Sequence, residues 1–331
     1  MRIIVSGGAG FIGSHTCVAL LQAGHEVVIA DNFSNSHPDV LTALKKISGK
    51  EFLFHQIDVT DQSAVNALFL ETKPDGVIHF AGFKAVGESV AQPLRYYQNN
   101  LLSTIVLAKS CLAYGVNQFV FSSSATVYGA NPPPLREDMT LLPTTNPYGQ
   151  TKVISERILM DVAAANPNFG VSLLRYFNPV GAHHSGLIGE NPNGIPNNLM
   201  PNITRTVAGR LPFLRVFGNN YDTPDGTCIR DYIHVMDLAE GHLAALNHLT
   251  PGTHIYNLGR GEGSSVFQLI HAFEEATGKQ VAYRMEARRP GDLSVSYADV
   301  SKAKQELDWT AKRDLIDMCR DAWRYEENSH S

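Results

Sequence analysis

Short apolar runs, rich in β-branched residues, recur along the chain. They predict strands at residues 2–5, 27–30, 52–57, 76–80, 118–121, 171–176 and 255–258. Runs of this kind suit strands that are buried on both faces of a sheet.

Helical stretches lie between these runs, at residues 12–23, 62–71, 94–114 and 147–165. In the second of them Val65, Leu68 and Phe69 share one face, which is typical of a helix that covers a sheet. The βαβαβ alternation predicts the α/β class, with a Rossmann-type, doubly wound parallel sheet.

The regular alternation ends near Phe177. A loop rich in proline and asparagine is predicted at residues 191–201, and helices are predicted again at residues 235–249 and 266–277. We therefore predict one domain over residues 1–177, to which residues 234–262 return. A smaller mixed α/β domain is predicted over residues 178–331.

The composition narrows the function classes. The chain has 331 residues, 44% of them hydrophobic and 18% charged, with a net charge of −5, so a compact protein is expected and nonspecific nucleic-acid binding is not. The four cysteines are far apart, which favours buried free thiols over disulfides or a metal site. Because no apolar run reaches the ~18 residues of a membrane span, we expect a cytoplasmic protein without membrane contact.

A glycine-rich segment between the first predicted strand and helix indicates dinucleotide binding. Gly7, Gly10 and Gly13 let the main chain turn and approach a pyrophosphate at the positive end of the helix. Asp31 ends the next strand, 18 residues after Gly13, where it can bind an adenosine ribose and repel a 2′-phosphate. NAD is thus favoured over NADP, the alternative being a glycine turn for packing alone. Asp58 fits either an adenine contact or an ordinary turn.

A second group of residues indicates proton and hydride chemistry. Tyr148 and Lys152 are four residues apart at the start of a predicted helix, so they share one face. An ammonium group near a phenol favours the phenolate, which makes the tyrosine a better base. Ser124 follows the fifth predicted strand, where open parallel sheets bind their ligands, and could bond the hydroxyl that is oxidised. Each feature alone also fits an exposed helix face or a polar loop.

Taken together, these motifs resemble the extended short-chain dehydrogenase/reductase family. The segments that carry the resemblance are GGAGFIG at residues 7–13, HFAG at 79–82, SSS at 122–124 and the Tyr148-x-x-x-Lys152 pair. Longer matching stretches are KAVGES at 84–89, SSSATVYG at 122–129, LRYFNPVGAH at 174–183, GIPNNLMP at 194–201 and RDYIHVMDL at 230–238. The resemblance runs from Met1 to about Trp323.

The resemblance implies an NAD-dependent isomerase that epimerises UDP-galactose and UDP-glucose at C4 through a transient 4-keto sugar. It implies that Tyr148 takes the proton of the 4-hydroxyl, that Lys152 lowers the tyrosine pKa and holds the nicotinamide ribose, and that Ser124 bonds the reacting oxygen. It also implies a set of further NAD contacts, which are Phe11, Ile12, Asn32, Phe33, Ser34, Asn35, Ser36, Asp58, Val59, Phe80, Ala81, Gly82, Phe83, Lys84, Asn99, Ser122 and Phe177.

The substrate contacts rest on the same resemblance. Arg230 and Arg289 are expected at the diphosphate, although without the resemblance solvated surface charge is the simpler interpretation. The other residues expected around the nucleotide and sugar are Asn178, Asn198, Leu199, Arg215, Phe217 and Asp292. The nearly all-apolar stretch at 94–114 resembles, with the helix after Tyr148, the pair through which such enzymes form homodimers; burial within its own domain is the alternative.

Departures from the family pattern sharpen the substrate prediction. Ser6 replaces the usual threonine and Phe83 the usual leucine, both mild changes. Ser296 stands where members restricted to glucose and galactose carry a large tyrosine, so we predict that UDP-N-acetylglucosamine and UDP-N-acetylgalactosamine are interconverted as well. A 4,6-dehydratase or decarboxylase is disfavoured because Ser124 is followed by Ala125 and Thr126 rather than by an acid. A noncatalytic NAD-sensing protein stays an alternative, and a secreted carbohydrate-binding module fits neither the glycines nor Asp31.

Overall fold

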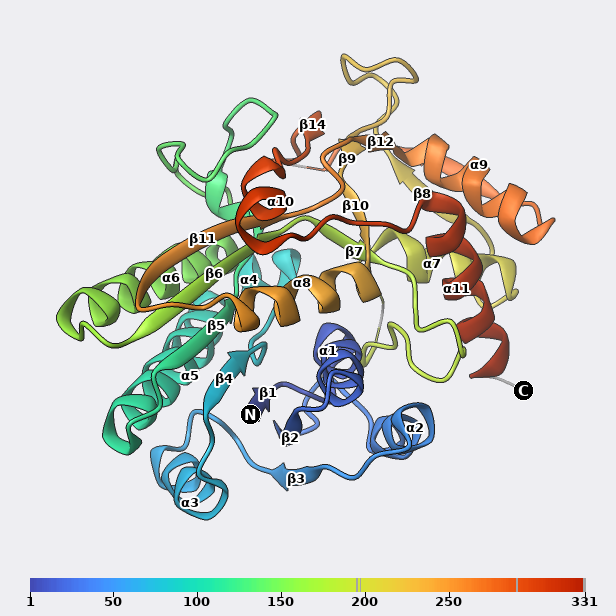
Figure 1. Cartoon of the computed structure of the whole chain (residues 1–331). Coiled ribbons are helices and arrows are strands. Elements are labelled where there is room, and N and C mark those ends of the chain that lie inside the picture. The colour runs from blue at the N-terminus through green and yellow to red at the C-terminus, as the bar shows by residue number, and fades with distance from the viewer. Residues whose placement is uncertain (195, 197, 290, 330–331) are drawn as a thin grey trace.

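A computed structural model describes residues 1–194, 196, 198–289 and 291–329. Within these residues, seven parallel strands form one sheet, in the spatial order β11, β6, β5, β4, β1, β2, β3 (Figure 1). Their bounds are β1 Arg2–Ser6, β2 Glu26–Asp31, β3 Leu53–Gln56, β4 Gly76–His79, β5 Gln118–Ser122, β6 Gly170–Tyr176 and β11 Gly252–Leu258. Each of the seven predicted strands belongs to this sheet, and the predicted Rossmann-type class is confirmed.

Helices cover both faces of the sheet, as the doubly apolar strands require. The helices α1 (Phe11–Gln22), α2 (Asp39–Ser48) and α8 (Val235–Asn247) lie on one face, and α3 (Gln62–Thr72), α5 (Pro93–Tyr114) and α6 (Pro147–Ala165) on the other (Figure 1). Alternate residues of β1 enter the two cores: Ile3 and Val5 pack on the α1 side, and Ile4 packs on the α3 side. The sheet is therefore a buried central layer.

After Tyr176 the chain forms much shorter strands. They pair as β7 (Asn178–Val180) with β10 (Tyr232–His234), β8 (Leu214–Phe217) with β13 (Tyr283–Glu286), and β9 (Ile229–Arg230) with both β12 (Ser264–Ser265) and β14 (Val295–Ser296). The helices α7 (Leu199–Val207), α9 (Val266–Thr277) and α11 (Leu315–Asn328) supply a third core around Ile203, Leu269 and Met318. Figure 1 shows these three helices together, beyond the end of α8.

The chain passes back to the large sheet between these short strands. Helix α8 packs against α1, and β11 pairs with β6 over its whole length. Residues 235–258 thus belong with the large parallel sheet and its covering helices. The domain boundary at residue 177 stays a prediction. The remaining elements are α4 (Val86–Ala91), the 3-10 turn η1 (Ala125–Tyr128) and α10 (Ser301–Leu307).

Some local predictions need correction. The predicted loop at 191–201 is wrong at its end, because α7 begins at Leu199; residues 195 and 197 of that loop lie outside the described residues. Helices α2 and α11 were not predicted, although each carries apolar residues at helical spacing: Val40, Leu44 and Ile47 in α2, and Leu315, Met318 and Ala322 in α11. A usable signal existed for α11, where Asp314 and Asp317 form a capping box.

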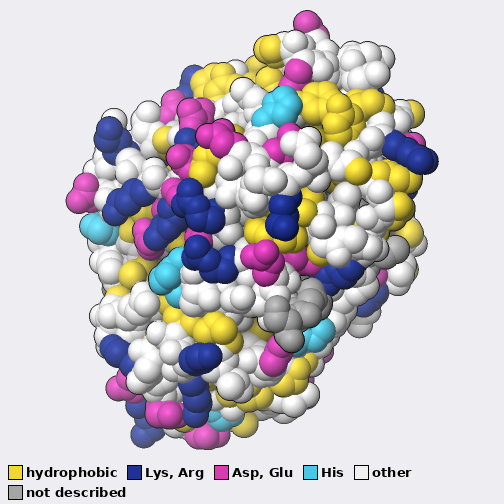
Figure 2. Space-filling model, turned by 90° about the vertical axis from the view of Figure 1, so that its right-hand side faces the viewer, with side chains coloured by type: hydrophobic (Ala, Val, Ile, Leu, Met, Phe, Trp, Pro, Cys, Tyr) yellow, Lys and Arg dark blue, Asp and Glu magenta, His cyan; other side chains and the backbone are white. Residues whose placement is uncertain are grey.

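The surface and the cysteines add two observations. All four cysteines are buried and free. Among the described residues, no helix is long and apolar enough to cross a membrane. On the face shown in Figure 2, the basic side chains are interspersed with acidic ones rather than gathered into a uniform field.

Candidate active site

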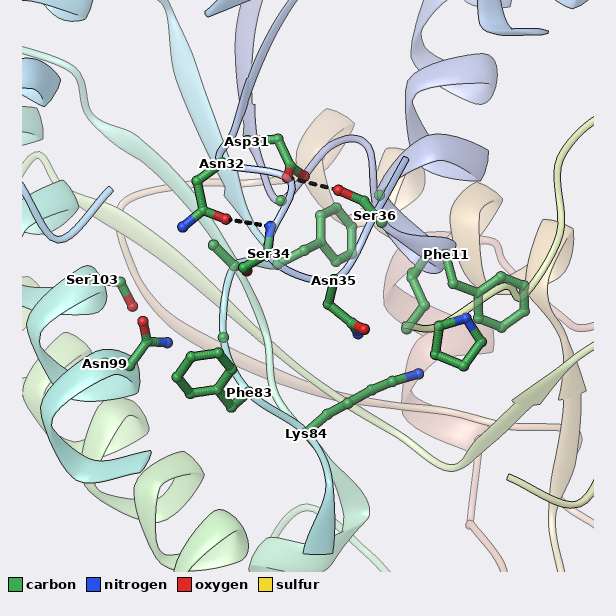
Figure 3. Close-up of a pocket in the computed structure, with 18 of the residues that line it drawn as sticks. Phe11, Asp31, Asn32, Ser34, Asn35, Ser36, Phe83, Lys84, Asn99 and Ser103 are labelled. Atoms are coloured by element: carbon green, nitrogen blue, oxygen red, sulfur yellow. Dashed lines mark hydrogen bonds between the residues drawn. The ribbon is translucent and has the colours of Figure 1, made fainter. Parts of the chain in front are cut away.

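A cavity of about 620 Å³ opens at the carboxyl ends of the parallel strands. Figure 3 shows its walls, to which Asp31 and its following loop, Phe11 and Lys84 contribute from different segments. The predicted cofactor residues that line it are Gly7, Gly10, Phe11, Ile12, Gly13, Asp31, Asn32, Ser34, Asn35, Ser36, Asp58, Val59, Phe80, Ala81, Gly82, Phe83, Lys84, Asn99, Tyr148 and Lys152. Phe33, Ser122, Ser124 and Phe177 do not belong to this lining.

The glycine segment is shaped by close backbone approaches. Gly7 has φ +72°, and a Cβ there would lie 2.7 Å from the backbone nitrogen of Ala81. A Cβ on Gly13 would overlap the carbonyl oxygen of Gly7. Helix α1 begins after Gly10 with no side-chain cap, so its first N–H groups are available to an anion at the cavity. These residues fit a pyrophosphate.

Asp31 is held rigidly at the end of β2. Its carboxylate accepts hydrogen bonds from the backbone of Ala9 at 3.0 Å and from the Ser36 hydroxyl at 2.9 Å, and Figure 3 shows the latter. The contacts of Asp58 fit both of its predicted roles. Its carboxylate accepts hydrogen bonds from the backbone N–H and the hydroxyl of Thr60, as a turn residue does, and it also lines the cavity. Two anchored carboxylates therefore border the region expected for the adenosine.

Tyr148 and Lys152 lie on the buried face of α6, beside the end of β5. Helix α6 begins at a defined position because the Asn146 side chain accepts the Gly149 backbone N–H at 2.9 Å. Lys152 Nζ donates to the carbonyl oxygen of Ser122 at 2.6 Å, and Ser124 is close enough to the Tyr148 phenol to affect its pKa. The three predicted catalytic side chains thus meet at one place, although only the tyrosine and the lysine line the cavity itself.

The pKa shifts of this group differ from the prediction that Lys152 lowers the tyrosine pKa. Burial raises the pKa of Tyr148, and Ser124 opposes that rise. Burial lowers the pKa of Lys152 to about 8, against the opposing charge of Glu156. Because the ammonium is directed at the Ser122 carbonyl, the residues of the chain do not by themselves lower the tyrosine pKa. A positive charge in the cavity, as on an oxidised nicotinamide, would do so.

The predicted diphosphate arginines form a second group, outside the cavity lining. Arg230 pairs with Asp292 at 2.5 Å, and its guanidinium also donates to the Leu293 carbonyl at 2.7 Å. Arg289 approaches Asp292 at 3.8 Å and lies over the Phe217 ring, 4.7 Å from its centroid. These contacts gather positive charge and an aromatic face, which suit a nucleoside diphosphate.

The other predicted substrate residues are placed around the same strands. Arg215 lies over Phe217 at 5.2 Å and pairs with Glu286, and Ser296 is opposite Arg230 in the β14–β9 pair. Asn178 starts β7 and donates its backbone N–H to Asp231. Asn198 caps α7 in front of the half-buried Leu199, and its side chain donates to Glu190 at 2.5 Å. Asn198 also reaches the cavity.

Several lining residues were missed by the sequence reasoning. They are Ala30, Ile57, Ala85, Glu88, Arg95, Tyr96, Ser103, Tyr176, Glu190, Asn191, Pro192 and Asn193. A signal existed for Tyr96 and Ser103, which share the polar side of the otherwise apolar α5 with Asn99. None existed for Glu190, whose contact with Lys84 at 2.9 Å joins segments 106 residues apart.

Comparisons with known proteins agree with this geometry. The model of the NAD dependent epimerase/dehydratase family matches residues 3–259. The UDP-glucose 4-epimerase of Bacillus subtilis (strain 168) is 54% identical over an alignment of 332 positions, which covers 99% of this chain and 98% of that protein. The crystal structure of UDP-glucose 4-epimerase from Bifidobacterium longum, with NAD+ and UDP, superposes with a TM-score of 0.97 at 48% identity, over 100% of this chain and 99% of that chain. The enzyme from Stenotrophomonas maltophila, with NAD and formylated UDP-arabinopyranose, also gives 0.97, at 47% identity and the same coverage.

Proposed function

The chain belongs to the NAD dependent epimerase/dehydratase family, and on that premise we propose that it interconverts UDP-galactose and UDP-glucose by epimerisation at C4. It is an isomerase with NAD as cofactor. The observation that carries the proposal is the meeting of Tyr148, Lys152 and Ser124 beside a cavity that begins at the glycine segment. Such a reaction requires a binding site for the pyrophosphate of the cofactor and an acid-base group next to it.

The residues divide the work between them. Bound NAD supplies the hydride acceptor and donor. Tyr148 takes the proton of the sugar 4-hydroxyl as C4 is oxidised and returns it when hydride comes back to the opposite face of the 4-keto sugar. Ser124 hydrogen-bonds the reacting oxygen, and the Lys152 ammonium favours the phenolate together with the positive charge that oxidised NAD would bring to the cavity. Arg230 and Arg289 hold the diphosphate, so the sugar is free to turn while the nucleotide stays bound.

The direct test is NMR of the purified protein with UDP-galactose, first without and then with added NAD. Conversion to a mixture with UDP-glucose is expected, and Tyr148→Phe should abolish it. Absence of conversion even with NAD would overturn the proposal, and would favour another nucleotide-sugar reaction or the noncatalytic NAD-sensing protein. Conversion that survives in Tyr148→Phe would remove the assigned role of the tyrosine.

The proposed substrate range extends to the UDP-N-acetylhexosamines. Ser296 is a small, half-buried residue of β14, and its partner on the neighbouring strand β9 is Arg230, which is expected to bind the diphosphate. A tyrosine at this position would occupy space beside the sugar. Ser296→Tyr should therefore remove turnover of UDP-N-acetylgalactosamine and keep that of UDP-galactose. The matched control is Ser294→Tyr, at an exposed position two residues away. Equal loss of both activities in Ser296→Tyr would contradict the specificity role.

A homodimer is proposed as the quaternary structure, and the exposed residues of one helix support it. Leu94, Leu102, Ile105 and Leu112 are exposed large apolar residues of α5, and their spacing places them on one side of the helix. A homodimer through α5 and α6 would cover them, and sedimentation at micromolar concentration tests this; a monomer would refute it.

The four free thiols support a reducing, cytoplasmic location.

A further inference from the structure

The end of β5 and the buried face of α6 meet in three successive contacts. Tyr148, Lys152 and Glu156 lie one helical turn apart and are all buried. Ser124 is close enough to Tyr148 to oppose the rise of its pKa, and the Ser122 carbonyl accepts a hydrogen bond from Lys152 Nζ. The third contact is the Ser123 hydroxyl, which donates to Glu156 Oε1 at 2.5 Å. Glu156 therefore belongs to the same row as the two assigned residues, although the proposed reaction does not use it.

Glu156 is fixed from the neighbouring strand by Arg175 of β6. The guanidinium donates through Nε at 3.0 Å and through its terminal nitrogen at 2.7 Å, and both side chains are 3% exposed. Arg175 also lies over the Tyr128 ring at 4.9 Å, and Tyr128 donates to Asn257 of β11 at 2.7 Å. A buried pair of this kind adds little net stability over apolar residues of the same shape. It does hold a negative charge at a fixed place.

The surroundings of Lys152 make that charge significant. Lys152 lies one helical turn from Tyr148 and from Glu156 on α6, and from β5 it meets the Ser122 carbonyl and the Phe121 ring. His79 of β4 is close enough to interact with its charge. From β6, Arg175 pairs with Glu156, and the Tyr176 hydroxyl accepts a hydrogen bond from Ser122. Burial lowers the pKa of His79 to about 3, so this imidazole is neutral, and burial raises the pKa of both tyrosines. Burial lowers the pKa of Lys152 as well, and Glu156 is the group that opposes it.

We propose that Glu156, held by Arg175 and Ser123, is a positioning residue that keeps Lys152 protonated and aligned beside Tyr148. The inference rests on the proposed function, because Lys152 serves Tyr148 in that reaction. Glu156 touches neither the cofactor nor the sugar and acts through the lysine alone. Its effect must therefore depend on pH, whereas a purely structural role would not produce such a dependence.

The test variant is Glu156→Gln, which keeps the shape of the side chain and removes its charge. An opposite charge close to an ionisable group shifts its pKa by about 1–3 units, and Glu156 lies one helical turn from Lys152 without forming an ion pair with it, so a shift of about one unit is expected. The alkaline limb of the kcat profile for UDP-galactose should move to lower pH by that amount, with KM unchanged. Asp161→Asn is the matched control, since it removes a carboxylate from the exposed side of the same helix.

The second readout does not need turnover. Trace acetylation of Lys152 across pH, followed by peptide mass spectrometry, gives the titration of the lysine in the holoenzyme. It should shift downward by about one unit in Glu156→Gln and stay fixed in Asp161→Asn. If kcat falls while neither the kcat profile nor the labelling curve moves, Glu156 is structural and the inference fails. If wild type does not epimerise but the labelling curve shifts, the proposed function fails and the role of Glu156 stands.

A double variant covers the case in which Glu156→Gln does not fold, because that change leaves Arg175 buried without its partner. Glu156→Gln/Arg175→Gln removes both charges and lets two amides hydrogen-bond. It should be more stable than Glu156→Gln and should show a downward shift of the Lys152 titration that is smaller than in Glu156→Gln, because the positive charge of Arg175 is removed as well. An unshifted titration in the double variant would overturn the inference.

Discussion

The two regions of the molecule position their functional residues in different ways. In the parallel sheet, the glycine segment and Asp31 are placed by the main chain, at the ends of strands that pair over four to seven residues. In the region after residue 177, Arg230 and Ser296 lie on strands of two residues. Their places depend on side-chain contacts such as Arg230 with Asp292, 62 residues apart. Backbone geometry thus defines the expected cofactor side, and ion pairs define the expected substrate side.

This difference predicts separable effects. A change on the sheet side should alter the fold of the glycine segment or the chemistry itself, because the residues there have little freedom. A change among the arginines should weaken substrate binding and leave the cofactor in place. A variant on the substrate side that loses NAD, or a variant on the cofactor side that weakens only substrate binding, would show that the two regions are coupled more tightly than their contacts suggest.

The largest effect is expected for Tyr148→Phe. Loss of a general base costs about 10²–10⁴-fold in rate, so kcat for UDP-galactose should fall by about 10³-fold. The ring stays in place, so the free energy of unfolding should change by no more than about 1.5 kcal/mol, the value of one hydrogen bond. Steady-state kinetics and thermal unfolding measure the two. Tyr114→Phe, at a half-buried tyrosine that packs on Phe69, is the control; a comparable kcat in both variants would refute the prediction.

Gly13→Ala should distort the glycine segment through steric overlap. The added methyl group overlaps the Gly7 carbonyl oxygen, and backbone must move to admit it. Overpacking of this kind costs about 1–3 kcal/mol, and the distorted segment should lose most of its NAD, measured by release of bound nucleotide after denaturation. Gly87→Ala is the control because a methyl group there meets open space in a helix, and a small gain in stability is expected. Full NAD content in Gly13→Ala would contradict the role of this close approach.

The same contrast explains what could be predicted from the sequence. The seven long strands follow from apolar runs, and the glycine segment, Asp31 and the Tyr148–Lys152 pair follow from spacing that a strand or helix makes local. Most of the short strands after residue 177 carry no periodicity, since two or three residues cannot show one. The four-residue strands β8 and β13 were missed because neither is a continuous apolar run. Glu190 and Asp292 acquire their partners only when distant segments meet, so no local pattern indicates them. The substrate residues were reached by resemblance alone.

Arg230→Gln should sharpen the comparison on the substrate side. Hydrogen bonds to charged groups contribute about 1.5–3 kcal/mol, so the KM for UDP-galactose should rise by about 10- to 100-fold while bound NAD stays unchanged. Arg289→Gln should have a smaller effect because that side chain is 56% exposed. Arg284→Gln, which removes an exposed guanidinium of β13 from above the Phe213 ring, is the control. Loss of NAD in Arg230→Gln would show that the two sides are not separable.

Acid stability tests the comparison without any substitution, and it too divides between the two regions. Burial lowers the pKa of His15 and His79 to about 3 and that of His242 to about 4, and these three pack in or on the parallel sheet. The unfolded chain therefore binds more protons than the folded one below pH 6.5, so stability is full above that pH and is lost as pH falls toward 4, by about 1.4 kcal/mol per pH unit for each histidine.

Two titrating groups oppose each other in the region after residue 177. Burial lowers the pKa of His183 to about 4, which destabilises the fold in acid in the same way. Burial raises the pKa of Asp231 to about 6, so this carboxyl takes up its proton more readily in the folded state and favours folding as pH falls through 6. Hydrogen exchange at pH 7 and pH 5 should therefore show the greater loss of protection in β1, β4 and α8, and a smaller one in α7 and α9. An even loss across both regions would mean that they unfold as one unit, whichever region holds the titrating groups.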